Sequence, residues 1–182
     1  MSLHWLPNAL TIARCLLAGV VAWLILTSPA GSIAPFIGFI LVALTDFVDG
    51  WAARRFDAVS KFGAFLDPVA DKLLVGMALV ALTLLADGHW ILLIPTTVII
   101  LRDTIATVLR LFPAIEMPVS QLAKWKTALE MVGIAALLLA SPLGSALITH
   151  AGTVLVWVAA TLSVYTLGLY VGAVIADVKR PR

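Results

Sequence analysis

The sequence predicts an all-α fold, a six-helix integral membrane bundle with both chain termini in the cytoplasm. Three observations predict it. Hydrophobic residues make up 62% of the 182 residues, and the mean hydropathy is +1.09. Charged residues make up only 12%, against about 25% in typical soluble chains. Six mostly apolar stretches, each close to the roughly 20 residues that a spanning helix needs, are separated by turn-forming residues.

The six expected helices follow one another with short breaks. Their approximate spans are Ala9–Leu26, Pro35–Ala53, Phe65–Leu85, Trp90–Leu111, Ala128–Ala140 with its flanks, and Ala151–Ile175. The breaks are Ser28–Gly31, residues 54–62, Asp87-Gly88, residues 113–118 and Ser141–Gly144. Pro35 fits the opening turn of the second helix, where its missing N–H costs nothing. The helices use almost the whole chain, so we expect one membrane domain over residues 1–182.

Lysine and arginine placement predicts the orientation of these helices. The turns near residues 27–34, 86–89 and 141–150 contain neither residue type. The alternate connections and the C-terminus hold Arg54, Arg55, Lys61, Lys124, Lys126, Lys179, Arg180 and Arg182. We therefore expect a multi-pass protein of the cell (inner) membrane, with its functional face toward the cytoplasm. The net charge of only +2, without a long basic run, disfavours nucleic-acid binding.

Four carboxylates lie inside apolar helices, where each charge costs about 2.5–3.5 kcal/mol at a helix centre. They are Asp46 and Asp49 in the second helix and Asp67 and Asp71 in the third. Their combined cost, on the order of 10 kcal/mol, would rival the net stability of a domain unless something compensates. A purely structural role for four such carboxylates is therefore hard to defend.

Helical geometry places these residues on two stripes. Asp46, Asp49, Gly50 and Ala53 share one face of the second helix, and Arg54 flanks it; Gly63, Asp67 and Asp71 form a stripe on the third helix. A short polar segment joins the two helices, so they can pack antiparallel with the stripes opposed. The glycines and the alanine leave room for a ligand beside the carboxylates.

Four hard oxygen ligands suit Mg²⁺ or Mn²⁺, and a pair of such ions suits phosphate-group chemistry. The alternative is a set of buried ion pairs between the aspartates and Arg54, Arg55 and Lys72. That alternative leaves acids in excess over nearby bases at buried depth.

The run Asp46-x-x-Asp49-Gly50-x-x-Ala53-Arg54, eight residues, Gly63-x-x-x-Asp67-x-x-x-Asp71 resembles the complete signature of the CDP-alcohol phosphotransferase family. The resemblance implies six membrane helices, a homodimer and two divalent cations, Mg²⁺ or Mn²⁺. It also implies transfer of a phosphatidyl group from a CDP-lipid to an alcohol, with release of CMP. Asp46, Asp49, Asp67 and Asp71 would hold the metals, and Asp71 would also be the catalytic general base on the acceptor hydroxyl.

The same resemblance implies a CDP-lipid site. Its residues would be Asn8, Thr11, Asp46, Gly50, Ala53, Arg54 and Gly63. Lipid tails would enter laterally, from the cleft between the second helix, the third helix and their neighbours. For the N-terminal piece an alternative remains open, in which Asn8 caps the first helix and Arg14 extends to the membrane interface.

The second half of the chain must bind the acceptor. Arg102 and Arg110 lie eight residues apart on one helix face, and Lys124 and Lys126 open the next helix. Four cations near one cytoplasmic cavity suit an anionic acceptor, most simply a phosphate. In the alternative interpretation Arg102 pairs with a local acid, Lys126 pairs with Glu130, and the remaining cations only follow the positive-inside rule.

The patterns Arg102-Asp103…Leu109-Arg110 and Lys124-Trp125-Lys126-Thr127 resemble the phosphatidylglycerophosphate synthase branch of that family. The branch implies glycerol 3-phosphate as acceptor and phosphatidylglycerol phosphate as product, in phospholipid biosynthesis. The chain departs from it at Asp103, Ala123 and Glu130, where the branch more often has Glu, Gly and Gln.

Other functions stay open. A cardiolipin synthase would use phosphatidylglycerol as acceptor, and another CDP-alcohol phosphotransferase would use a different alcohol. A small ion channel or transporter would also carry intramembrane carboxylates, although these acids cluster near one face without a polar path to the other. A metal-dependent lipid phosphate hydrolase would use water as nucleophile. The acceptor, the metal, the acyl-chain preference and the dimer surface are not fixed by the sequence.

Overall fold

The computed structural model describes the backbone of residues 6–55, 61–110 and 121–178, and the side chains of residues 12–45, 72–108, 122, 124–169 and 172. Over these ranges the chain forms six helices, as the sequence predicts. They are α1 (Leu6–Thr27), α2 (Ala34–Arg55), α3 (Lys61–Leu85), α4 (Trp90–Arg110), α5 (Gln121–Leu143) and α6 (Ala146–Val178).

Five of the six helices begin earlier than expected: α2 by one residue, α1 and α3 by three and four residues, and α5 and α6 by more. Helix α5 begins at Gln121, seven residues before the predicted core of its span, and α6 begins at Ala146 rather than Ala151. The break between them is also shorter, because α5 continues through Pro142 and the turn is confined to Gly144 and Ser145. Gly144 adopts φ +58°, a left-handed conformation that ends a helix readily when the residue is glycine. The Ser145 hydroxyl then accepts the Ile148 N–H at 3.4 Å, which caps α6.

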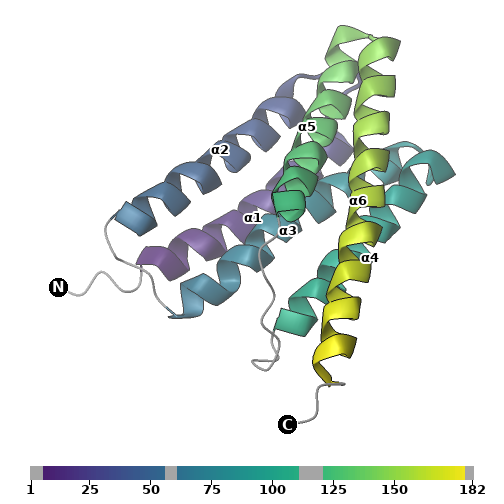
Figure 1. The fold of residues 1–182 in the computed structure, drawn as a ribbon. Coiled ribbons are helices and arrows are strands. Elements are labelled where there is room, and N and C mark those ends of the chain that lie inside the picture. Colours follow the sequence, from purple (N-terminus) through teal and green to yellow (C-terminus); the bar gives the residue numbers. More distant parts are fainter. Residues whose placement is uncertain (1–5, 56–60, 111–120, 179–182) are drawn as a thin grey trace.

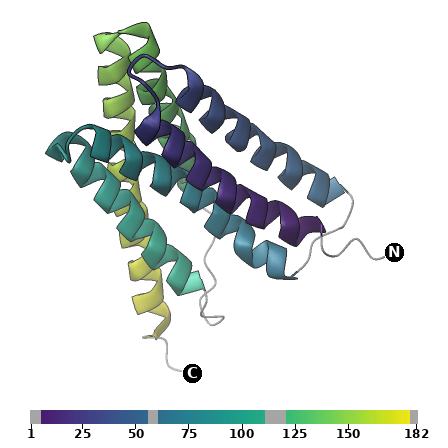
Figure 2. The ribbon, with the colours of Figure 1, turned by 180° about the vertical axis from the view of Figure 1, so that it is seen from behind.

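The helices form two groups of three. Helix α1 packs against both α2 and α3 and lies between them in both views (Figures 1 and 2). Helices α4 and α5 both pack along α6, while α3 contacts α4 and α5 and so joins the two groups. Successive helices run in alternate directions, so α1, α3 and α5 begin at the end of the molecule where α2, α4 and α6 finish (Figure 1). The three turns without lysine or arginine lie at the opposite end.

Small side chains set the closest helix contacts in the core. Ala18 and Ala22 of α1 and Ala78 of α3 are almost fully buried in one apolar cluster. Between α5 and α6 two glycines lie in tight contact with the facing helix. A Cβ added at Gly152 would lie 3.0 Å from the Gly133 carbonyl oxygen, so only glycine fits at that crossing.

The outer face of the bundle is apolar. Many large hydrophobic side chains are exposed on it, among them Leu16, Trp23, Leu41 and Leu147. Three helices contain described segments long and apolar enough to cross a membrane, namely Trp90–Val108, Lys124–Leu143 and Ala146–Leu169. The described parts of the other three helices carry the shorter apolar stretches Ile12–Thr27, Ala34–Thr45 and Lys72–Leu85. An apolar surface of this extent is that of a membrane protein.

Candidate functional site

The predicted metal ligands lie on backbone that is helical throughout. Asp46 and Asp49 fall in the last three turns of α2, and Asp67 and Asp71 fall in the first three turns of α3. The spacing on each helix therefore matches the stripes expected from the sequence. The side chains of all four aspartates, the predicted base Asp71 included, lie outside the described residues, so their convergence stays a prediction.

The predicted CDP-lipid residues also have undescribed side chains. They are Asn8 and Thr11 on α1, Gly50, Ala53 and Arg54 on α2, and Gly63 on α3, together with Asp46. Nearby, the described side chain of Arg14 is 8% exposed. Arg14 therefore lies inside the bundle. The alternative interpretation, in which Arg14 extends to the membrane interface, is not met.

The four predicted acceptor cations divide into two described environments. Arg102 of α4 and Lys126 of α5 are buried, at 5% and 2% exposed. Lys124 is exposed, two residues before Lys126 and therefore on another face of α5. The Arg110 side chain lies outside the described residues. The structure thus brings together Arg102 and Lys126, and does not bring Lys124 to them.

Arg102 and Lys126 meet at one carboxylate oxygen. Arg102 Nη1 donates to Asp103 Oδ1 at 2.9 Å, and Lys126 Nζ donates to the same oxygen at 2.5 Å. Lys126 Nζ also lies 3.2 Å from Glu130 Oε1, one turn along α5. The two pairings that the alternative interpretation predicts, Arg102 with a local acid and Lys126 with Glu130, are both present.

A common oxygen fixes the separation of the two cations. Arg102 Nη1 and Lys126 Nζ are no more than about 5.4 Å apart, the combined length of their contacts to Asp103 Oδ1. Two positive charges at that separation repel by about 3 kcal/mol at an effective dielectric constant near 20. The carboxylate between them offsets this repulsion, so Asp103 holds Arg102 and Lys126 close together.

Two further polar residues complete this cluster and were not singled out from the sequence. The Thr166 hydroxyl of α6 accepts Arg102 Nη2 at 2.9 Å, and it donates to backbone carbonyls within α6. Ser163, one turn earlier, is fully buried, and its hydroxyl has no hydrogen bond among the described residues. From the sequence, only the position of Asp103 next to Arg102 indicates a polar cluster. The contribution of α6 could not be predicted, because it depends on how the helices pack.

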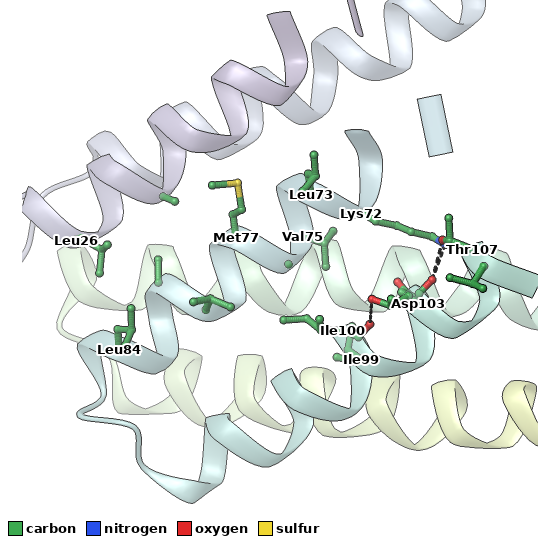
Figure 3. A pocket seen from close by; sticks show the side chains of 16 residues that line it. Leu26, Lys72, Leu73, Val75, Met77, Leu84, Ile99, Ile100, Asp103 and Thr107 are labelled. Carbon is green, nitrogen blue, oxygen red and sulfur yellow. Dashed lines mark hydrogen bonds between the residues drawn. The ribbon is translucent and has the colours of Figure 1, made fainter. Parts of the chain in front are cut away.

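Lys72 links the cluster to α3. Its Nζ donates to the Asp103 carbonyl oxygen at 3.0 Å and to the Thr107 hydroxyl. The Lys72 side chain thus extends from α3 to α4 (Figure 3). Lys72 directly follows Asp71 in the chain. The two buried cations therefore lie close to the part of α3 that carries the predicted base.

An apolar groove of about 610 Å³ begins at this lysine. It is lined by α1, α3 and α4, with Lys72, Asp103 and Thr107 at one end and Leu26 and Leu84 at the other (Figure 3). Almost all of its remaining lining is aliphatic, including Gly76 and Ile100. A groove with one polar end and an otherwise apolar lining suits a single acyl chain whose headgroup lies at the polar end.

Comparisons with known proteins agree with the sequence signature. The family model described as CDP-alcohol phosphatidyltransferase matches residues 4–165. A protein of Rickettsia typhi named CDP-diacylglycerol–glycerol-3-phosphate 3-phosphatidyltransferase is 40% identical over 169 residues, covering 88% of this chain and 92% of that protein. A protein of the same name from Rickettsia bellii is 38% identical, with 88% and 90% covered.

A plant protein with another name is also similar. The cardiolipin synthase (CMP-forming) of Oryza sativa is 35% identical over 184 residues, which cover 91% of this chain and 56% of that protein. The family model matches most of the chain, and each of these three relatives is at least 35% identical to it over 88% of the chain or more. The chain belongs to the CDP-alcohol phosphatidyltransferase family.

Proposed function

We propose that this membrane protein transfers the phosphatidyl group of CDP-diacylglycerol to glycerol 3-phosphate, giving phosphatidylglycerol phosphate and CMP in phospholipid biosynthesis. The likeness over nearly the whole chain to bacterial proteins named for this reaction carries the proposal. The buried pair Arg102 and Lys126 agrees with it, because a phosphate-bearing acceptor needs cations held close together.

For the metal site we propose that Asp46 and Asp49 of α2 and Asp67 and Asp71 of α3 hold two divalent cations, Mg²⁺ or Mn²⁺. The donor set fits such ions, since four carboxylates offer hard oxygen ligands and neutralise their charge. When bound, the ions supply Lewis-acid polarisation of the phosphoryl oxygens.

The protein's own residues perform the remaining steps. Asp71 takes the proton of the acceptor hydroxyl as that oxygen attacks the lipid-side phosphorus. The bond between this phosphorus and the bridging pyrophosphate oxygen breaks, and CMP leaves with the bridging oxygen. Arg102 and Lys126, with Arg110 nearer the cytoplasm, bind the acceptor's phosphate and so hold its hydroxyl near the phosphorus that it attacks. Lys124, which is exposed on another face of α5, stays outside this site.

We assign the donor to the opposite side of Asp71. Asn8, Thr11, Gly50, Ala53, Arg54 and Gly63 frame the cytidine diphosphate, as the family resemblance implies. The groove that starts at Lys72 takes one acyl chain of the lipid. This assignment follows from position, because the polar end of the groove is one residue from Asp71 in the chain.

The proposed arrangement in the cell follows from the helix ends. Six spans place the lysine-rich connections, the active site and both termini on the cytoplasmic side of the inner membrane. Exposed Trp90 is the first residue of α4, and exposed Trp125 lies in the first two turns of α5, at the opposite end of the bundle, where interfacial aromatic residues are expected. We also propose a homodimer. The Gly168-x-x-x-Gly172 face of α6 is available for it, since a Cβ at either glycine would meet no described atom within 4 Å.

An acceptor panel tests the proposal. Purified protein with Mg²⁺ or Mn²⁺ is given CDP-diacylglycerol and, separately, glycerol 3-phosphate, phosphatidylglycerol, inositol phosphate or serine, and CMP and lipid products are measured. We expect CMP release that depends on glycerol 3-phosphate, with phosphatidylglycerol phosphate formed in equal amount. A preference for phosphatidylglycerol would favour the second candidate, a cardiolipin synthase, which the Oryza relative supports. CMP release without acceptor would indicate a hydrolase, and none at all would favour a channel or transporter.

A further inference from the structure

Asp103 is the point where three helices exchange polar contacts. Its Oδ1 accepts Arg102 Nη1 from α4 and Lys126 Nζ from α5, at 2.9 Å and 2.5 Å. Its backbone carbonyl accepts Lys72 Nζ from α3 at 3.0 Å. The proposed reaction uses the two cations to bind the acceptor's phosphate but gives Asp103 no task.

Burial makes this geometry rigid. Asp103 is 8% exposed and its two cationic partners are less exposed still, so solvent screens the attraction between these charges only weakly. On its far side the Arg102 guanidinium is held through Nη2 by Thr166 of α6. Arg102 is thereby fixed in orientation from two sides, and Lys126 is fixed in distance from Arg102.

We propose that Asp103 is a positioning residue of the acceptor site, which holds Arg102 and Lys126 at the separation needed to bind one phosphate group together. The inference rests on the proposed function, because it deepens the acceptor-phosphate site. Asp103 touches neither the acceptor nor the donor in this role. It acts through the two cations, which repel each other and would separate without the negative charge between them.

Two other roles for Asp103 predict different changes in the KM values. If Asp103 occupied the place of the phosphate in the empty site, the acceptor would have to displace it, and removing its charge would strengthen acceptor binding. If the ion pairs only stabilised the fold, removing the charge would affect both substrates and the unfolding temperature alike. The sign and the selectivity of the change in KM therefore separate the three roles.

The test compares Asp103→Asn with Asp103→Glu in the wild-type background. Asparagine keeps the size and the acceptor oxygen but removes the charge. We expect the KM for glycerol 3-phosphate to rise about tenfold or more, the loss expected when a charge-assisted hydrogen bond becomes a neutral one. The competitive inhibition constant of inorganic phosphate should rise in parallel, while the KM for CDP-diacylglycerol and kcat at saturating acceptor change less than about twofold. Asp103→Glu should recover most of the acceptor affinity.

Two further variants keep the test decisive. Asp87→Asn neutralises an exposed acid on the α3–α4 turn and should leave every constant unchanged. If Asp103→Asn does not fold, Thr166→Val removes the hydrogen bond that Arg102 Nη2 donates to α6, and it should raise the same KM selectively. An unchanged or lowered KM for glycerol 3-phosphate in a folded variant would overturn the positioning role alone. A wild-type protein inert toward glycerol 3-phosphate would overturn the proposed function with it.

Discussion

The contact of α5 with α6 at Gly133 and Gly152 allows a quantitative prediction for Gly152→Ala. A Cβ at Gly152 would lie 3.0 Å from the Gly133 carbonyl oxygen, 3.0 Å from the Leu137 backbone nitrogen and 2.9 Å from Leu137 Cγ, whereas ordinary contact begins at 3.4 Å. Two of these atoms are backbone, so the helices must part by about 0.4 Å. Overpacking of this kind costs about 1–3 kcal/mol, from which alanine recovers about 0.5–1 kcal/mol through its better helix propensity.

The measurement is thermal unfolding of the purified protein in detergent, followed by far-ultraviolet circular dichroism. A net loss of about 1–2 kcal/mol corresponds to a Tm lowered by roughly 2–8 °C for a chain of this size. Gly76→Ala in α3 is the matched control, because its Cβ would meet only Ile100 Cγ1, at 3.8 Å. That variant should keep or slightly raise the Tm. Equal Tm values for Gly152→Ala and the control would refute the close helix contact.

Three other outcomes are expected. Lys126→Met leaves the Asp103 and Glu130 carboxylates buried without their lysine, and it should lower the free energy of unfolding by about 3–5 kcal/mol. The double variant Lys126→Met with Glu130→Met should recover part of this loss. If the two changes in unfolding free energy simply add, the pairing of Lys126 with Glu130 is contradicted. Asp71→Asn should abolish phosphatidyl transfer while its Tm stays near that of the wild type, and near-normal activity would remove Asp71 as the base. Gly76→Leu narrows the α1–α3–α4 groove and should raise the KM for long-chain CDP-diacylglycerol more than for a dioctanoyl analogue; equal effects on both would remove the acyl chain from the groove.

The helices could be predicted from the sequence because hydropathy is a local property. Their number is confirmed, and the ends of α3 at Leu85 and the start of α4 at Trp90 are correct to the residue. The fifth predicted span is centred on Ala128–Ala140, with Lys124 and Lys126 opening its helix, and α5 extends about one turn further back, to Gln121. Lys126 lies buried inside this helix, where Asp103 and Glu130 pair with its charge.

The acceptor cluster could be predicted only in part. The pairing of Lys126 with Glu130 follows from their spacing of four residues and is confirmed at 3.2 Å. The meeting of Arg102 with Lys126 depends on how α4 and α5 pack, and Thr166 comes from α6, at a position that belongs to no motif. The tight glycine crossing was likewise missed. Gly133 is the one glycine of α5, and Gly152 lies sixteen residues before the next glycine of α6, so neither belongs to a spaced pair that would indicate a helix contact.

The central claim is that an acceptor hydroxyl attacks the lipid-side phosphorus of CDP-diacylglycerol. The most direct measurement uses glycerol 3-phosphate labelled with ¹⁸O at its hydroxyl groups, with mass analysis of both products. Attack by the hydroxyl predicts that the phosphatidylglycerol phosphate retains the label at its new ester bond and that the CMP contains none. Label in the CMP, or solvent oxygen in the lipid phosphate, would contradict the account.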